Sequence, residues 1–372
     1  AIFQGSAGSA GTYMMSRTTE RIKAFLSHNW SVPRWKKFIA LSFHFNTDVA
    51  CCGSALFTLL LAILTATGSF PFVDAGIYGR SGLFVRLLFV PIFFLLLFFA
   101  RDLARVFGFY GPLVFLDKAC ISQVDDSAQR AAILKLGAFL AKSDQMIVIY
   151  SNVYLKKLWT VYEVASFLAL HPVDRMKVVP VTQAIVFVIC LLIFYMFHIG
   201  TLVLMATSNL DLLGYPIGFV CGWGGMYVLR TWARDRILIG SRLSEFDVHE
   251  CICFLEADRP VVYRNIATLM KASRAVHRHA SEDEALRAFN SLVHSILPNA
   301  FGRALGQRYF QLKHYLFFGI CANGPATLDY TCTGIARDEV PRKVLGTFLY
   351  NSLLAASLWP LVLMLMEVVT SR

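Results

Sequence analysis

The chain has 372 residues, of which 56% are hydrophobic and only 16% are charged, and its mean hydropathy is +0.57. Soluble chains carry about 25% charged residues, so this composition indicates an integral membrane protein. The formal net charge of +11 is expected to reflect membrane orientation. Nucleic-acid binding is not expected, because no basic tract is interleaved with aromatic residues.

The nine cysteines are scattered along the chain, and no Cys-x-x-Cys pair occurs. This pattern predicts reduced thiols rather than a disulfide framework or a zinc site. His277 and His279 give only a weak metal signal, and an exposed polar helix is the better interpretation. No metal is therefore predicted, whereas bound lipid is expected.

In chain order, residues 1–21 predict a flexible arm that lacks the apolar core of a signal peptide. Residues 22–28 predict a short buried strand that ends in polar groups. Two apolar runs follow, at 49–67 and 83–100. Each is close to the roughly 20 residues that cross a bilayer, so both are predicted membrane spans. Arg86 lies near the start of the second run, where its long side chain can reach the headgroups.

The segment 112–182 alternates short apolar runs with runs of helical spacing. Strands are expected at 113–117, 145–151 and 177–181, and helices at 128–143 and 157–170. Short strands that alternate with helices indicate βαβ units and a parallel sheet.

Three further apolar runs predict membrane spans at 183–206, 212–229 and 344–366, which makes five in all. Between the last two, residues 230–343 have helical patterns, and Ser281-x-x-Glu284 is a capping box before a helix expected to stop at Pro298. The apolar stretch 315–320 is too short to span. Residues 230–343 are therefore predicted to form a helical region outside the bilayer.

Lysine and arginine residues set the predicted orientation. Of the 35, 32 lie in three stretches outside the spans: 6 up to residue 48, 10 in 101–182 and 16 in 230–343. The positive-inside rule places these stretches, and the N-terminus, on the cytoplasm-equivalent face. With five spans, the C-terminus is predicted on the opposite face.

Gly214, Gly218 and Gly222 form two consecutive G-x-x-x-G spacings on one face of the fourth predicted span. In lipid, such small residues let helix backbones approach closely. Packing within the helix bundle is the preferred interpretation, and homodimerisation is the alternative. Because no predicted span carries an internal Asp, Glu or Lys, a transporter or channel is only the third choice of function.

Four motifs occur in this order along the chain: "AFLSH", "VFLD", "IVIYS" and "LWTVYE". Together they resemble the signatures of the Toll/interleukin-1 receptor (TIR) domain, which has a flavodoxin-like fold. The resemblance covers 22–30 and 112–182. It implies a split, truncated TIR-like domain, since 31–111 and two spans stand where the family has one helix. As a whole, the chain also resembles a group of multi-span algal membrane proteins.

Many TIR domains cleave NAD, and the family's catalytic glutamate matches Glu163. The resemblance implies that this carboxylate stabilises an oxocarbenium-like state as nicotinamide leaves. Trp159, one helical turn away, would line the ring pocket. Ser27 and Asp117 would contact ribose or phosphate, because they end strands of a sheet whose first strand is expected at the centre.

Each of these residues also has a plainer interpretation. Glu163 would be a solvated or ion-paired helix residue, Trp159 a core or interface residue, and Asp117 a turn former or a partner of Lys118. The sequence favours a membrane-anchored TIR-like scaffold, or an accessory subunit of a larger membrane assembly, that contacts lipid and other subunits or copies of itself. An NAD glycohydrolase that uses Glu163 is the alternative.

Overall fold

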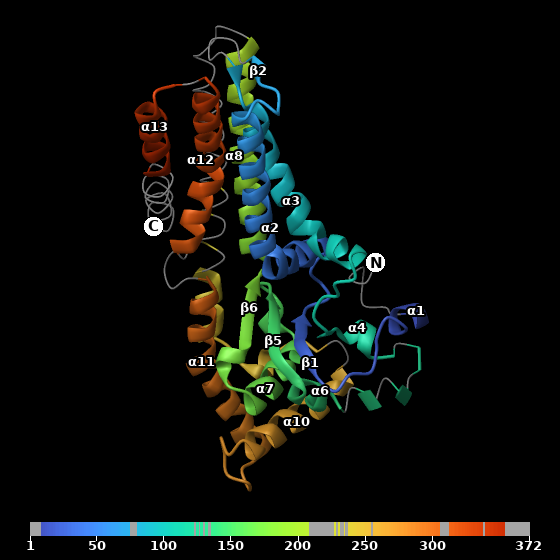
Figure 1. Cartoon of the computed structure of the whole chain (residues 1–372). Coiled ribbons are helices and arrows are strands. Elements are labelled where there is room, and N and C mark those ends of the chain that lie inside the picture. Colours follow the sequence, from blue (N-terminus) through green and yellow to red (C-terminus); the bar gives the residue numbers. More distant parts are fainter. Residues whose placement is uncertain are drawn as a thin grey trace. The chain divides into compact units, whose positions relative to one another are not determined.

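The computed structural model describes residues 9–74, 80–207 and 234–353, with 227 and 230, apart from gaps at 123, 126, 129–130, 133–134, 235–236, 254–255, 306–311 and 338. The chain divides into two compact units. The first, which we call the α/β unit, comprises residues 1–41, 111–182 and 235–307. The second, the helical unit, comprises residues 42–110, 183–234 and 308–372. Figure 1 labels their elements.

The α/β unit contains a four-stranded parallel sheet, which confirms the predicted sheet type. Its strands are β1 (Ile22–His28), β4 (Val114–Phe115), β5 (Ser143–Tyr150) and β6 (Met176–Pro180). Their order across the sheet is β4-β1-β5-β6, so β1 and β5 are central. Ile22 pairs with Ser143, and the register runs on to His28 and Ile149.

The helices of the α/β unit are α1 (Ala10–Tyr13), α4 (Asp117–Cys120), α6 (Leu136–Ala141), α7 (Leu158–Leu170), α10 (Arg259–Ala272) and α11 (Glu282–Leu305). Of these, α6, α7 and α11 contact strands of the sheet, whereas α1 buries none of its residues. Single 3-10 turns are η2 (Tyr154–Lys156), η3 (Val173–Arg175), η5 (Val248–Glu250) and η6 (Glu256–Asp258). Phe25, Met146 and Val148 of the central strands share one buried core with side chains of these helices. Because the strands are buried, their sequences are nearly continuous apolar runs.

At the ends of α11, one local expectation is confirmed and one is wrong. The capping box is present, because Ser281 Oγ accepts from the backbone N of Glu284 at 3.1 Å and Glu284 Oε2 accepts from the backbone N of Ser281 at 2.8 Å. The predicted stop at Pro298 is wrong, since α11 continues to Leu305. The buried side chain of Phe301 lies beyond the proline, so packing outweighs the one hydrogen bond that a proline removes.

Residues 235–307 belong to the α/β unit, whereas the sequence limits the α/β domain to 22–30 and 112–182 and treats 230–343 as one separate region. Helix α10 packs on α7, and α11 packs on β6. Phe301 meets Tyr150 edge to face, with ring centroids 4.6 Å apart. This segment therefore completes the core of the sheet.

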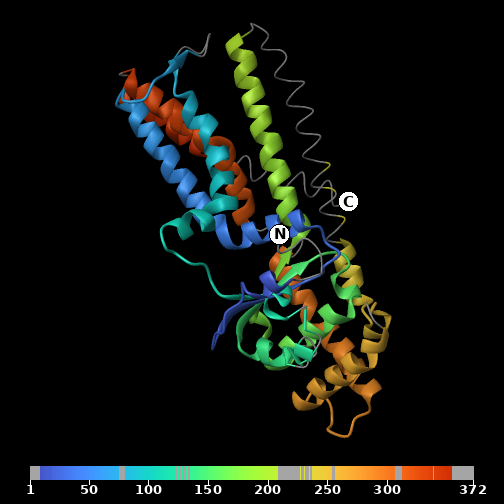
Figure 2. The ribbon, with the colours of Figure 1, turned by 90° about the vertical axis from the view of Figure 1, so that its right-hand side faces the viewer.

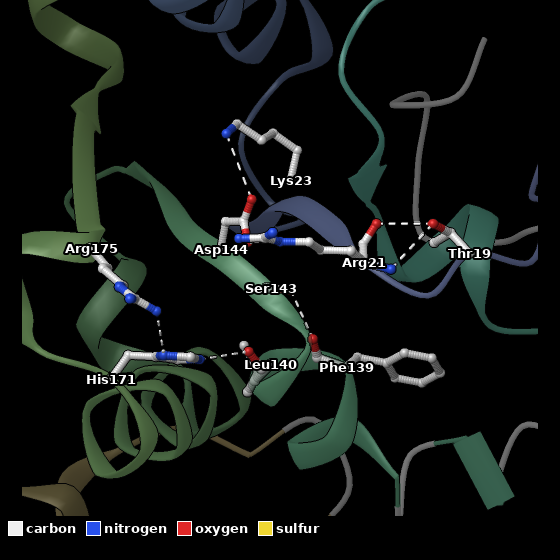
Figure 3. A network of polar contacts seen from close by, with 9 residues as sticks. All are labelled: Thr19, Arg21, Lys23, Phe139, Leu140, Ser143, Asp144, His171 and Arg175. Carbon is white, nitrogen blue, oxygen red and sulfur yellow. Dashed lines mark hydrogen bonds and ion pairs between the residues drawn. The ribbon is translucent and has the colours of Figure 1, made fainter.

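Polar contacts hold the amino ends of the central strands, as Figure 3 shows. Arg21 Nε donates to Asp144 Oδ1 at 2.5 Å, and Lys23 Nζ lies 3.6 Å from Asp144 Oδ2. The hydrogen bond from Arg21 lowers the pKa of Asp144. Nearby, the His171 Nε2 atom lies 3.0 Å from the carbonyl oxygen of Leu140, which joins the end of α7 to α6. The ion pairs of Asp144 with Arg21 and Lys23 thus link the start of β1 to the start of β5.

The helical unit is built from long helices. They are α2 (Arg34–Ala66, which starts in the α/β unit), α3 (Leu83–Val106), α8 (Val181–Thr207), α12 (Leu312–Ala336) and α13 (Pro341–Leu353), with the short strands β2 (Val73–Asp74) and β3 (Arg80–Ser81) between α2 and α3. Among the described residues, α2 and α3 are long and apolar enough to cross a membrane by length and composition. Figure 2 shows α2, α3 and α12 as neighbouring helices.

The predicted spans map unevenly onto these helices. The first three predicted spans lie within α2, α3 and α8. The fourth, with Gly214, Gly218 and Gly222, lies outside the described residues except for Tyr227, and only 344–353 of the fifth are described. Residues 315–320 belong to α12, a helix of 25 residues within the region that the sequence predicts to be helical, although the sequence does not predict one helix of this length. Five spans therefore stay a prediction.

Replacing Phe289, which is fully buried in α11, should test whether 235–307 is part of the α/β core. Phe289→Ala is expected to lower the free energy of unfolding by about 3–5 kcal/mol, because it opens a cavity. Ser295→Ala, at an exposed position of the same helix, should change it by less than about 0.5 kcal/mol. Urea unfolding in mild detergent, followed by tryptophan fluorescence, measures both. Equal values would contradict the shared core.

Candidate functional site

The carboxyl ends of β1 and β5 mark the point where the strand order reverses, because β4 lies beyond β1 and β6 lies beyond β5. Open parallel sheets bind ligands outside this point. Strand β1 ends in Ser27 and His28, and β5 ends at Tyr150. We call this edge, together with the residues that follow each strand, the strand-end site.

Glu163 of α7 reaches the strand-end site through a chain of hydrogen bonds. Ser27 Oγ donates to Glu163 Oε2 in a short hydrogen bond. The Oγ of Ser27 also lies 2.5 Å from the hydroxyl of Tyr154. Either hydroxyl can be the donor of this second hydrogen bond. Ser27 and Tyr154 are fully buried, and Glu163 is half-buried, so this chain links β1, η2 and α7 inside the unit.

The Glu163 carboxyl is held in its neutral form. Burial raises its pKa from 4.5 to about 8, the hydrogen bond from Ser27 opposes this rise, and the negative charge of Asp117 adds to it. Burial and the nearby Glu163 also raise the pKa of Tyr154 well above its usual value of 10. At neutral pH the carboxyl and the phenol are therefore both protonated.

Asp117 lies near the neighbouring strand end, two residues after β4 ends and at the start of α4. Its carboxylate accepts a hydrogen bond from Trp30 Nε1 at 2.9 Å and one from the backbone N of Lys118 at 2.6 Å. Trp30 follows the end of β1 by two residues. The contact between Asp117 and Trp30 therefore joins the chain segments that leave β1 and β4.

Two lysines lie over the Trp30 ring. Lys37 Nζ is 4.7 Å from the ring centroid and Lys118 Nζ is 5.5 Å from it. Both lysines are buried, with 0% and 6% of their surface exposed. The negative face of an indole stabilises such cations. The ring of His28 meets Trp30 edge on at 4.4 Å, and burial lowers the pKa of His28 to about 4 against the opposing effect of Asp117, so this imidazole is neutral at pH 7.

The structure brings three of the four predicted site residues together. Ser27 contacts Glu163, and Asp117 lies close enough to influence its pKa. The indole of Trp159 instead packs on the core and meets Tyr162 edge on at 5.9 Å. The indole at the strand-end site is Trp30.

Sequence reasoning missed three members of the site: Trp30, Lys37 and Tyr154. Trp30 lies two positions past a predicted strand end, and this position was the signal by which the sequence could have indicated it as a site residue. Lys37 lies in the first turns of α2 and is one of the six lysine and arginine residues up to residue 48 from which only membrane orientation is predicted. Its burial depends on how α2 leaves the sheet, which no local pattern records.

No family model, curated protein or solved structure matches this chain. Among the described residues, no group of three or more His, Cys, Asp or Glu side chains could hold a metal ion. A neutral Glu163 can donate a proton, whereas stabilising a positive charge requires the carboxylate that forms as pH rises through about 8. At neutral pH the carboxyl therefore acts as a hydrogen-bonding group between β1 and α7.

The raised pKa of Glu163 predicts a specific pH dependence of stability. The folded chain keeps a proton on Glu163 that the unfolded chain releases above pH 4.5, so the contribution of Glu163 to the free energy of unfolding falls as pH rises from 4.5 to about 8. His28, whose pKa is lowered from 6.5 to about 4, contributes the opposite slope below pH 6.5, so the net free energy of unfolding should fall between pH 6.5 and about 8. Glu163→Gln should remove this slope, because an amide does not titrate. Urea unfolding across this pH range measures it. Glu245→Gln, at an exposed position of the same unit, is the matched control, and an unchanged slope in Glu163→Gln contradicts the assignment.

Proposed function

We propose that this chain is a membrane-anchored interaction protein. The helical unit lies in the bilayer, and the α/β unit is a TIR-like scaffold module or the docking part of an accessory subunit in a larger membrane assembly. The observation that carries the proposal is the inside-out distribution of side chains in the helical unit.

Helix α2 shows this distribution most clearly. Its outward positions are large and apolar, with about half or more of the surface exposed at Leu56, Leu59, Leu60 and Ile63. Its buried positions include hydroxyl side chains, at Ser54, Thr58 and Thr65. The hydroxyls of Thr58 and Thr65 donate to carbonyls one turn earlier, at 2.7 and 2.8 Å. A helix in water has the reverse pattern, whereas lipid favours apolar groups outside and small polar groups at helix contacts.

Helix α3 has the same character. Leu95, Phe99 and Leu103 are exposed, although the helix also contributes Phe93 and Leu97 to a packed cluster. In the most apolar stretch of each helix, only 33% of the residues of α2 and 39% of those of α3 are buried. The core helix of a soluble protein would be mostly buried, so this exposure supports a lipid environment.

The strand order supports the TIR-like part of the proposal. Numbered along the chain, β4-β1-β5-β6 is 2-1-3-4, which begins the 2-1-3-4-5 order of flavodoxin-like folds. The motif residues also fall at matching places: Ser27 and His28 end β1, Asp117 follows β4, and Glu163 lies in α7.

The state of Glu163 supports a scaffold rather than an enzyme. Its carboxyl is engaged by Ser27 and is protonated near neutral pH. The carboxylate of Asp117 likewise accepts a hydrogen bond from Trp30. Groups that bind one another in this way stabilise the domain.

Membrane anchoring and association can be measured on the full chain. Alkaline carbonate should leave the chain in the membrane pellet, because the apolar outer surface of the helical unit contacts lipid. Native mass spectrometry in mild detergent should show the chain with further copies or other subunits. A chain released into the supernatant contradicts anchoring, and a lone monomer contradicts the interaction role.

NAD cleavage is the second candidate, and the observation that favours it is a carboxyl of shifted pKa at the reversal point of a parallel sheet. Nicotinamide release should then increase as pH rises through about 8, because the charge-stabilising form is the carboxylate. Glu163→Gln should abolish release, whereas Glu245→Gln should retain it. Absence of release, or release that persists in Glu163→Gln, removes this candidate.

A further inference from the structure

Helices α3 and α12 of the helical unit are joined by a buried ion pair. Arg86 Nε lies 2.5 Å from Asp329 Oδ2, and the two side chains are 7% and 1% exposed. Ser81 Oγ donates to both Asp329 oxygens, at 3.1 and 2.9 Å, and Thr333 Oγ1 donates to Oδ1 at 3.2 Å. The guanidinium carbon of Arg86 lies 4.4 Å from the ring centroid of Tyr330. Asp329 is thus both paired with a cation and hydrogen-bonded, as a buried charge requires.

These contacts fix the direction of α12. Its residues Cys332 and Thr333 lie next to Gly82, whose backbone N donates to Thr333 Oγ1 at 3.3 Å. A Cβ atom at Gly82 would lie 3.1 Å from Cys332 Sγ and 3.2 Å from Cγ2 of Thr65, at the end of α2. The last turns of α12 therefore lie at the turn between α2 and α3. Its first turns lie toward the other end of that hairpin, where the chain connects to the α/β unit.

The length of α12 matches a full crossing. Its 25 residues extend roughly 37 Å at about 1.5 Å per residue, against a hydrocarbon core of about 30 Å. Exposed positions near its end are large and apolar at Tyr330 and Ile335, while Thr327 and Asp329 are buried. The outer face thus suits lipid acyl chains.

Helix α13 turns back along α12. Residues 337–340 join the two helices, and a connection this short makes neighbours antiparallel. The backbone N of Glu339 donates to the carbonyl of Gly334 at 3.0 Å, and a Cβ at Gly334 would lie 3.0 Å from Val344 Cγ2. The outer face of α13 is apolar as well, at Leu345, Leu349, Tyr350 and Leu353.

The chain leaves the α/β unit three times, at residues 42, 183 and 308, and it re-enters that unit at 111 and 235. We propose that α12 and α13 begin a third membrane hairpin, whose outer faces contact lipid acyl chains. The Arg86–Asp329 ion pair attaches this hairpin to the α2–α3 hairpin, and we call this attachment the fastening. The direction of α13 then returns the chain toward the face from which α12 departs. This differs from the sequence prediction, which placed the C-terminus on the opposite face. It rests on the membrane anchoring proposed above.

Protease protection of tagged full-length chains in sealed vesicles tests this topology. One tag precedes Ala1, one follows Arg372, and one is inserted on a flexible spacer after Glu339. The first two should be digested from the same side of the membrane and the third from the other side. A tag after Arg372 on the side opposite the first tag overturns the proposal, as does a Glu339 tag on the same side as the first. Release by alkaline carbonate is a separate outcome, because it overturns the anchoring itself.

Variants of the ion pair test the fastening. Asp329→Leu leaves Arg86 buried without its carboxylate, and it should lower the Tm in detergent far more than Asp48→Leu, which removes an exposed carboxylate of α2. The double variant Arg86→Leu/Asp329→Leu should recover most of the loss. If Asp329→Leu gives no folded protein, the double variant is compared with Arg86→Leu alone. Additive losses from the two single variants would overturn the fastening.

Discussion

The pairing of β1 with β5 is the contact on which the sheet of the α/β unit depends. It joins residues 22–28 to residues 143–149, and the α2–α3 hairpin lies between them in the chain. Because the strands are parallel, the chain leaves β1 at one end of the sheet and must enter β4 from the other. The sheet is therefore connected by the chain to both ends of the hairpin, and β4 and β6 extend it on the two sides that this pairing leaves open.

Glu163 illustrates how burial changes the role of a residue. Its position at the reversal of strand order would suit chemistry, yet Ser27 and Tyr154 turn it into an internal link between a strand and a helix. The Arg86–Asp329 pair makes a similar link within the helical unit. In both units a residue type that can carry a charge lies inside: Ser27 donates to the Glu163 carboxyl, and Asp329 is paired with Arg86 and accepts from Ser81 and Thr333. These contacts link the elements that carry the residues.

The sequence revealed the elements whose signals are local. The apolar runs of β1 and β5 and the capping box of Ser281 needed no partner to be recognised. The sequence did not predict α12 as one long helix, because Asp329 and neighbouring threonines interrupt its apolar pattern. The partner of Asp329, Arg86, lies more than 240 positions earlier. The sequence also did not predict the position of Trp30 or the packing of 235–307 on the α/β unit, since both depend on contacts between distant segments. Topology indicated Ser27 and Asp117, which follow strand ends, and the family resemblance indicated Glu163; the residues that only packing brings to the site were missed.

The order of the strands along the chain also has a consequence for synthesis. Ile22 leaves the ribosome well before its partner Ser143, and the α2–α3 hairpin emerges in the interval. At roughly 5–20 residues per second, β1 waits on the order of 10 s for β5, and in that interval only the two-residue strand β4 emerges to pair with it. On the membrane anchoring proposed above, insertion of the hairpin would hold the end of β1 close to the bilayer during that time. The membrane would then limit the search by which β5 finds its place, and a nascent chain that failed to insert would carry an apolar strand without β5 into solution.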